Sequence, residues 1–69
     1  MTTFFTFTTL NRVITIQAET TEKAKHIAIA SVLSRLVKAD PFMTGETFER
    51  LQTGLEIEFA GATVNKLEV

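Results

Sequence analysis

The sequence predicts a small single α+β domain of element order ββα(α)ββ, in which an antiparallel sheet packs on one main helix. The chain opens with two segments rich in Phe, Thr, Val and Ile, residue types that favour strands. A long stretch with apolar side chains at helical spacing follows, and a second alternating stretch lies near the end. Strands at both ends of a helical middle are typical of α+β domains. We expect one domain over residues 1–69, because a chain of 69 residues is too short for two.

The first expected strand covers residues 2–9 and consists almost entirely of Phe and Thr. Successive side chains of a strand point to opposite faces, so Phe5 and Phe7 share one face. We expect Phe4, with Thr6 and Thr8, on the other face.

A second strand is expected over residues 13–18, after a turn at Asn11 and Arg12. Asn tolerates the backbone conformations that tight turns require. The two strands therefore form a hairpin. The side chains expected to point inward from the second strand are Ile14, Ile16 and Ala18.

A long helix is predicted from Thr20 or Thr21, whose hydroxyl would cap it, to about Ala39. Its apolar side chains cover roughly 200° of the circumference, which is wider than one sheet needs. Something beyond the sheet must therefore cover the remainder. The polar strip of this helix is narrow and consists of Ser31, Ser34, Arg35 and Lys38.

Asp40 and Pro41 end this helix, because Pro lacks an amide donor and restricts the residue before it. The next two residues, Phe42 and Met43, are apolar and are expected to lie under the fold.

A short second helix is expected over residues 45–52, capped by Thr44 and ended by Gly54. Phe48 and Leu51 lie three residues apart on one face of it. This helix is the candidate cover for the excess apolar surface of the first.

Residues 55–59 alternate between apolar and acidic side chains, which predicts a third strand followed by a turn at residues 60–61. Glu56 and Glu58 would then share the solvent face.

A fourth strand is expected from Ala62, with Ala62 and Val64 directed into the core. Leu67 and Val69 would then point outward. Either a bulge returns them to the core, or together with Phe4 they form an apolar surface for a partner.

The composition excludes several classes of protein. With no Cys the chain forms no disulfide, and with one His a structural zinc site is not expected. Seven Lys and Arg balance eight Asp and Glu, which is too even for nonspecific nucleic-acid binding. Neither a signal peptide nor a membrane span is apparent. We expect a protein of the host-cell cytoplasm with no cofactor, no metal and no membrane partner.

Few side chains suggest catalysis. His26 lies on the expected helix without a catalytic partner at suitable spacing, and an exposed helix residue is the simpler interpretation. Glu56 and Glu58 are suitably spaced for acid and base work, but also fit an ordinary solvated face. We therefore do not expect an enzyme or a small-molecule substrate.

Residues 16–28 run from a strand into a capped helix and resemble segments of small phage-encoded anti-CRISPR proteins of the type I-F class. Residues 40–54 have no counterpart in that family. The resemblance implies a non-enzymatic inhibitor that occupies a surface of a CRISPR surveillance complex and blocks its encounter with target DNA. Lys25 carries over as a contact. Besides Thr20 at a hydroxyl position, the matching residues are Ile16, Ala18, Ala24, Lys25, Ile27 and Ala28.

The sequence thus predicts a phage- or prophage-type interaction protein that sterically inhibits a host protein or ribonucleoprotein complex. The alternative is a homodimeric structural or regulatory module with no inhibitory role. No direct contact with nucleic acid is expected in either case. The predicted partner-binding residues are Lys25, Ser31, Arg35, Lys38, Phe4 and Leu67.

Overall fold

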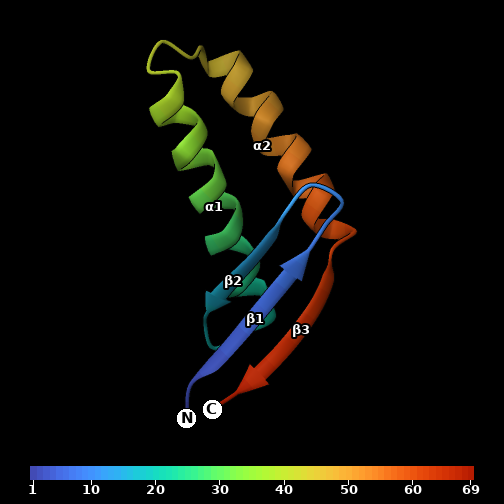
Figure 1. Ribbon diagram of the computed structural model, residues 1–69. Coiled ribbons are helices and arrows are strands. Elements are labelled where there is room, and N and C mark those ends of the chain that lie inside the picture. The colour runs from blue at the N-terminus through green and yellow to red at the C-terminus, as the bar shows by residue number, and fades with distance from the viewer.

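Three antiparallel strands and two helices make up the fold in the computed structural model, which describes all residues from 1 to 69 (Figure 1). The sheet has the strand order β2-β1-β3, so the N-terminal and C-terminal strands are neighbours. The predicted α+β class, an antiparallel sheet with a helical middle between its strands, is confirmed. Of the two C-terminal strands expected, the second is present. The elements are β1 (Thr3–Thr8), β2 (Val13–Gln17), α1 (Thr21–Ala39), α2 (Gly45–Ala60) and β3 (Thr63–Glu68).

The hairpin of β1 and β2 has the predicted arrangement of faces. Phe5 pairs with Ile16 and Phe7 with Ile14 on the inner face, against which the helices pack. Both Phe side chains are buried, because this face carries the apolar half of each strand. The opposite face, which we call the outer face, carries Phe4 and the Thr side chains.

Helix α1 begins where the hydroxyl pattern predicts. The side chain of Thr20 accepts a hydrogen bond of 3.2 Å from the backbone N–H of Lys23, which satisfies an amide that has no partner within the helix. The helix ends at Asp40, before Pro41. Its buried side chains are Ala24, Ala28, Ile29, Val32 and Leu33.

The prediction of a strand over residues 55–59 is wrong, because these residues belong to helix α2. Gly54 does not end the helix but lies within it, and Gly61 caps the end. A stripe of apolar residues at spacings of three and four continues through Gly54 and packs on the core, as a helix requires. Ile57, the residue that fits only the alternating pattern, is 70% exposed. The stripe consists of Phe48, Leu51, Leu55 and Phe59.

Strand β3 pairs with β1 in a continuous register, with Phe4 opposite Leu67 and Phe7 opposite Val64. Leu67 points outward with no bulge in the ladder, which decides between the two alternatives that the sequence left open. Ala62 packs against the core as expected. Val64 was expected in the core but is exposed, because the helices do not cover β3. All six residues of β3 are exposed.

The core is small. Nine residues are buried, and at its centre the rings of Phe7 and Phe59 lie edge to face with 5.8 Å between their centroids. This contact joins β1 to α2, and α1 completes the core from the side of β2. So few buried residues leave a thin margin of stability in a chain of this length.

The helices form a hairpin that extends well beyond the sheet (Figure 1), and the molecule measures 41 × 21 × 17 Å. Phe42, at the tip of the helical hairpin, was expected under the fold but is 91% exposed, because no part of the sheet reaches it. Met43 is half-buried. Neither helix combines the length and the apolar content that crossing a bilayer requires.

Candidate interaction surfaces

The molecule exposes more surface than a compact chain of its mass. Its accessible area is 4999 Å². A compact monomer of 7.7 kDa exposes about 4,300 Å². Its radius of gyration is 12.9 Å, against about 11 Å for a compact domain of this length. The protruding helical hairpin and the uncovered sheet account for the difference.

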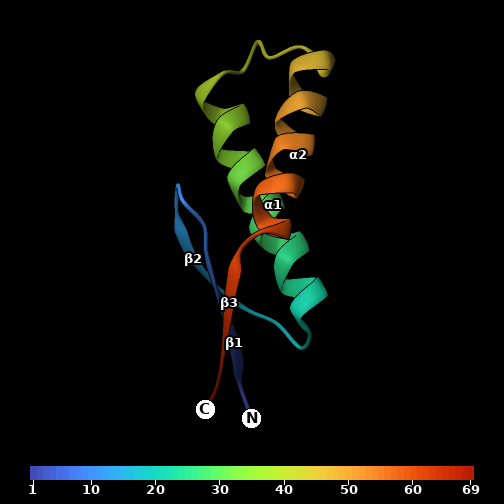
Figure 2. The same ribbon diagram turned by 90° about the vertical axis from the view of Figure 1, so that its right-hand side faces the viewer.

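The outer face of the sheet is the largest flat part of this surface. Figure 2 shows both helices on the other side of the sheet, so nothing covers the outer face. None of the side chains that the strands direct onto this face is charged, although charged residues make up 22% of the chain. These side chains are Phe4, Thr6, Thr8, Val13, Thr15, Gln17, Thr63, Asn65 and Leu67.

Two predicted partner-binding residues meet on this outer face. Phe4 and Leu67 stand directly opposite each other in the β1–β3 ladder, with Phe4 half-buried and Leu67 62% exposed. On the β2 side, the hydroxyls of Thr6 and Thr15 are hydrogen-bonded at 3.0 Å. The face therefore combines an apolar end with a centre of hydroxyl groups.

Three other predicted contacts lie together on α1. Ser31, Arg35 and Lys38 are four and three residues apart, which places them on one face of the helix. Arg35 and Lys38 are exposed, and Ser31 is half-buried. We call these three residues the α1 strip. Because α1 packs on the inner face of the sheet, the α1 strip and the outer face point to different sides, but they adjoin at the edge of β2, where Arg35 lines a groove with Val13 and Thr15.

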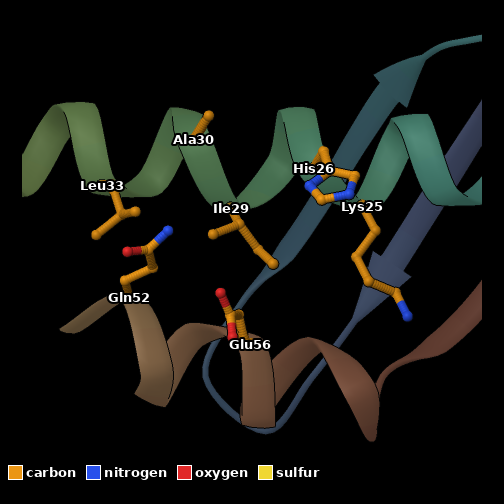
Figure 3. A pocket seen from close by; sticks show the side chains of 7 residues that line it. All are labelled: Lys25, His26, Ile29, Ala30, Leu33, Gln52 and Glu56. Carbon is orange, nitrogen blue, oxygen red and sulfur yellow. The ribbon is translucent and has the colours of Figure 1, made fainter. Parts of the chain in front are cut away.

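The sixth predicted contact, Lys25, lies apart from the α1 strip. It lines a groove between α1 and α2 with a volume of about 310 Å³. Figure 3 shows Gln52 and Glu56 pointing from α2 toward α1, with His26 and Lys25 on the α1 side. The apolar lining is provided by Ile29, Ala30 and Leu33.

The predicted placement of the Glu56 and Glu58 carboxylates on one face is wrong. Glu56 and Glu58 were expected on one face of a strand, but two residues along a helix turn about 200°. Glu56 therefore lines the groove, and Glu58 points to the β1–β2 turn. They do not form a carboxylate pair.

Glu58 is the most strongly bonded carboxylate of the chain. Thr9 Oγ1 donates to its Oε2 at 2.9 Å, and Asn11 Nδ2 donates to its Oε1 at 3.3 Å. Arg12 Nε lies 2.9 Å from Oε2 in an ion pair without hydrogen-bond geometry, and Arg12 Nη2 donates to Oε1 at 3.5 Å. This cluster joins the β1–β2 turn to the end of α2.

Burial alone would raise the pKa of Glu58, but the bonds from Thr9 and Asn11 and the charge of Arg12 outweigh it and lower the pKa. Sequence reasoning missed the cluster because it placed Glu58 on a strand. The spacing of Phe48, Leu51, Leu55 and Phe59 is the signal that would have shown it.

Charge is divided between the two helices. Helix α1 carries four Lys and Arg and one Glu, whereas α2 carries four Glu and one Arg. The net charge of −1 therefore conceals a cationic helix beside an anionic one. The α1 strip lies on the cationic helix, so its charge complements an acidic surface.

Comparison of the chain with protein-family models, with curated proteins and with solved structures finds no match.

Proposed function

We propose that this chain is a non-enzymatic interaction protein that acts by occupying a surface of a larger host protein or ribonucleoprotein complex. The observation that carries the proposal is the excess of exposed area, roughly 700 Å² over a compact monomer. This is close to one partner's share of a standard interface, about 800 Å². In addition, ten large hydrophobic side chains are exposed, including Leu10, Phe42 and Ile57. Such a surface is suited to a protein that functions when bound to a partner.

The α1 strip is the surface best suited to a host partner. Arg35 and Lys38 extend from a rigid helix, and no acidic residue follows Glu22 along α1 to neutralise them. Arg forms planar paired hydrogen bonds with carboxylates, so it favours an acidic protein surface. Charges at the rim of an interface mainly raise the association rate and select the partner.

The resemblance of residues 16–28 to type I-F anti-CRISPR proteins determines which complex to test first. These residues form the end of β2 and the capped first half of α1, including Lys25. In this proposal the chain binds a surveillance complex and blocks its access to target DNA sterically.

The experiment mixes the intact chain with a purified type I-F surveillance complex and follows co-elution and the binding of labelled target DNA. The proposal expects co-elution and at least a tenfold loss of DNA binding. The variant Arg35→Glu with Lys38→Glu should weaken both effects at least tenfold.

A matched control reverses two exposed cations elsewhere, Arg50 and Lys66, to Glu and changes the net charge equally. This control should retain binding. Absence of co-elution and of inhibition with the wild-type chain would refute the proposed target. Equal losses in both double variants would refute the role of the α1 strip.

A further inference from the structure

We propose that the outer face of the sheet is a self-association surface that packs against the same face of a second copy of this chain. The inference does not depend on the proposed function, because no residue of the outer face belongs to the α1 strip. It starts from the uncharged outer face centred on Thr6, with Phe4 and Leu67 paired at one end.

The absence of charge on this face favours a second copy as the occupant. In a two-fold dimer a surface meets itself, so any net charge on it would face the same charge. The outer face avoids this conflict, since its side chains are Thr, Asn, Gln, Val, Phe and Leu. The centres of protein interfaces are likewise depleted of charged residues. The helices, by contrast, carry strong and opposite charges.

The area of the face also fits a dimer of modest affinity. Three strands of about six residues present a surface of roughly 20 × 14 Å. Two such faces cover roughly 560 Å² together, which is less than the roughly 1,200 Å² at which specific interfaces begin, so the contact belongs to the weak, transient class. Sheets pack face to face with their layers about 10 Å apart, which allows Phe4, Leu67 and Val13 to interdigitate with their counterparts. We therefore expect a weak dimer that dissociates in the high-micromolar range.

Dimerisation would also supply stability that the chain lacks alone. Only nine residues are buried in the monomer, and the sequence contains no Cys for a disulfide. Chains of this length with one small core commonly gain stability from a partner copy. In the dimer both faces of the sheet would be covered, the inner face by the helices and the outer face by the sheet of the second copy.

The test is sedimentation equilibrium of the intact chain from micromolar to millimolar concentration, at low and at high salt. We expect a concentration-dependent increase in mass toward twice 7.7 kDa, with little dependence on salt. Leu67→Glu should weaken dimerisation at least a hundredfold. Thr6→Lys should weaken dimerisation as strongly. This second variant keeps the test valid if Leu67→Glu impairs folding, because it removes no core side chain.

Ile57→Glu is the matched control, because Ile57 is as exposed as Leu67 but lies on α2. It should dimerise like the wild type. A monomeric mass at millimolar concentration would overturn the proposal. So would a dimer that persists in Leu67→Glu and Thr6→Lys, or one that salt dissociates, since each places the interface on the charged helices.

Discussion

Glu58 and Arg12 join the end of α2 to the β1–β2 turn, with Arg12 Nε 2.9 Å from Glu58 Oε2. The two side chains are only 17% and 34% exposed, so water screens the pair less than it screens the other ion pairs of the chain. Helix α2 meets the β1–β2 turn through this pair and through the bonds from Thr9 and Asn11. The pair therefore adds a polar link between the helical hairpin and the sheet, beside the core contact of Phe7 with Phe59.

Replacement of this carboxylate should destabilise the fold. Glu58→Gln keeps the shape of the side chain but removes its charge, and we expect a loss of about 1 kcal/mol in the free energy of unfolding. Urea unfolding measures the loss. Glu56→Gln, which makes no bond or ion pair in the structure, should change stability by only a few tenths of a kcal/mol. Equal effects of the two substitutions would contradict the role of the cluster.

The same carboxylate should make stability depend on pH. The pKa of Glu58 in the folded state lies below its ordinary value of 4.5, so the unfolded chain binds a proton more readily. Its contribution is present above pH 4.5 and is lost as the pH falls through the folded pKa. Unfolding experiments at pH 7 and at pH 3 should therefore show a smaller loss of stability for Glu58→Gln than for the wild type. An identical loss would mean that Glu58 is not the group that titrates.

Gly54→Ala should stabilise the protein by about 0.5–1 kcal/mol, because Gly is unfavourable in a helix interior. Nothing lies within 4 Å of the position that the new Cβ would occupy. Gly61→Ala, at the cap of α2, should change stability by only a few tenths of a kcal/mol. Thermal unfolding distinguishes the two. A destabilising Gly54→Ala would indicate that Gly54 ends a helix and is not inside one.

Thr20→Ala should cost about 1 kcal/mol of unfolding free energy, since it removes the hydroxyl that accepts the N–H of Lys23. Thr21→Ala, one residue later, should be neutral or slightly stabilising, because Ala is the better helix former. The sequence allowed either residue as the cap, and this pair of substitutions separates them. A larger cost at Thr21 would reverse the assignment.

The parts of the fold that could be predicted are those in which local signals agree. In β1 and β2 the alternation and the β-forming residues coincide, and at Thr20 and Thr44 a hydroxyl precedes an apolar helical pattern. These signals placed the hairpin and the start of both helices correctly. The sequence left Leu67 open between burial through a bulge and an exposed position, and the unbroken β1–β3 register shows the exposed one. The pairing of Phe4 with Leu67 required the order of the strands, which no local signal gives.

Residues 55–59 show why the remainder could not be predicted. Leu55 and Phe59 are four apart, and this spacing fits both the period of a strand and that of a helix. Only Ile57 separates the two, and its exposure favours the helix. Phe48 and Leu51 continue the stripe of Leu55 and Phe59 at helical spacing, but the alternation of residues 55–59 and the helix end expected at Gly54 outweighed this signal. Whether residues 55–59 form a helix or a strand decides where Glu56 and Glu58 lie. The groove and the Arg12 cluster depend on these two positions.

The surfaces described above all depend on α2 running without a break from Gly45 to Ala60. A strand over residues 55–59 would add to the sheet, move Glu58 away from Arg12 and change which face is open. The most direct measurement is the backbone carbon chemical shifts of residues 55–59 in solution. We expect Cα shifts displaced downfield of their random-coil values throughout, as in a helix. Upfield displacement, as in a strand, would contradict this expectation.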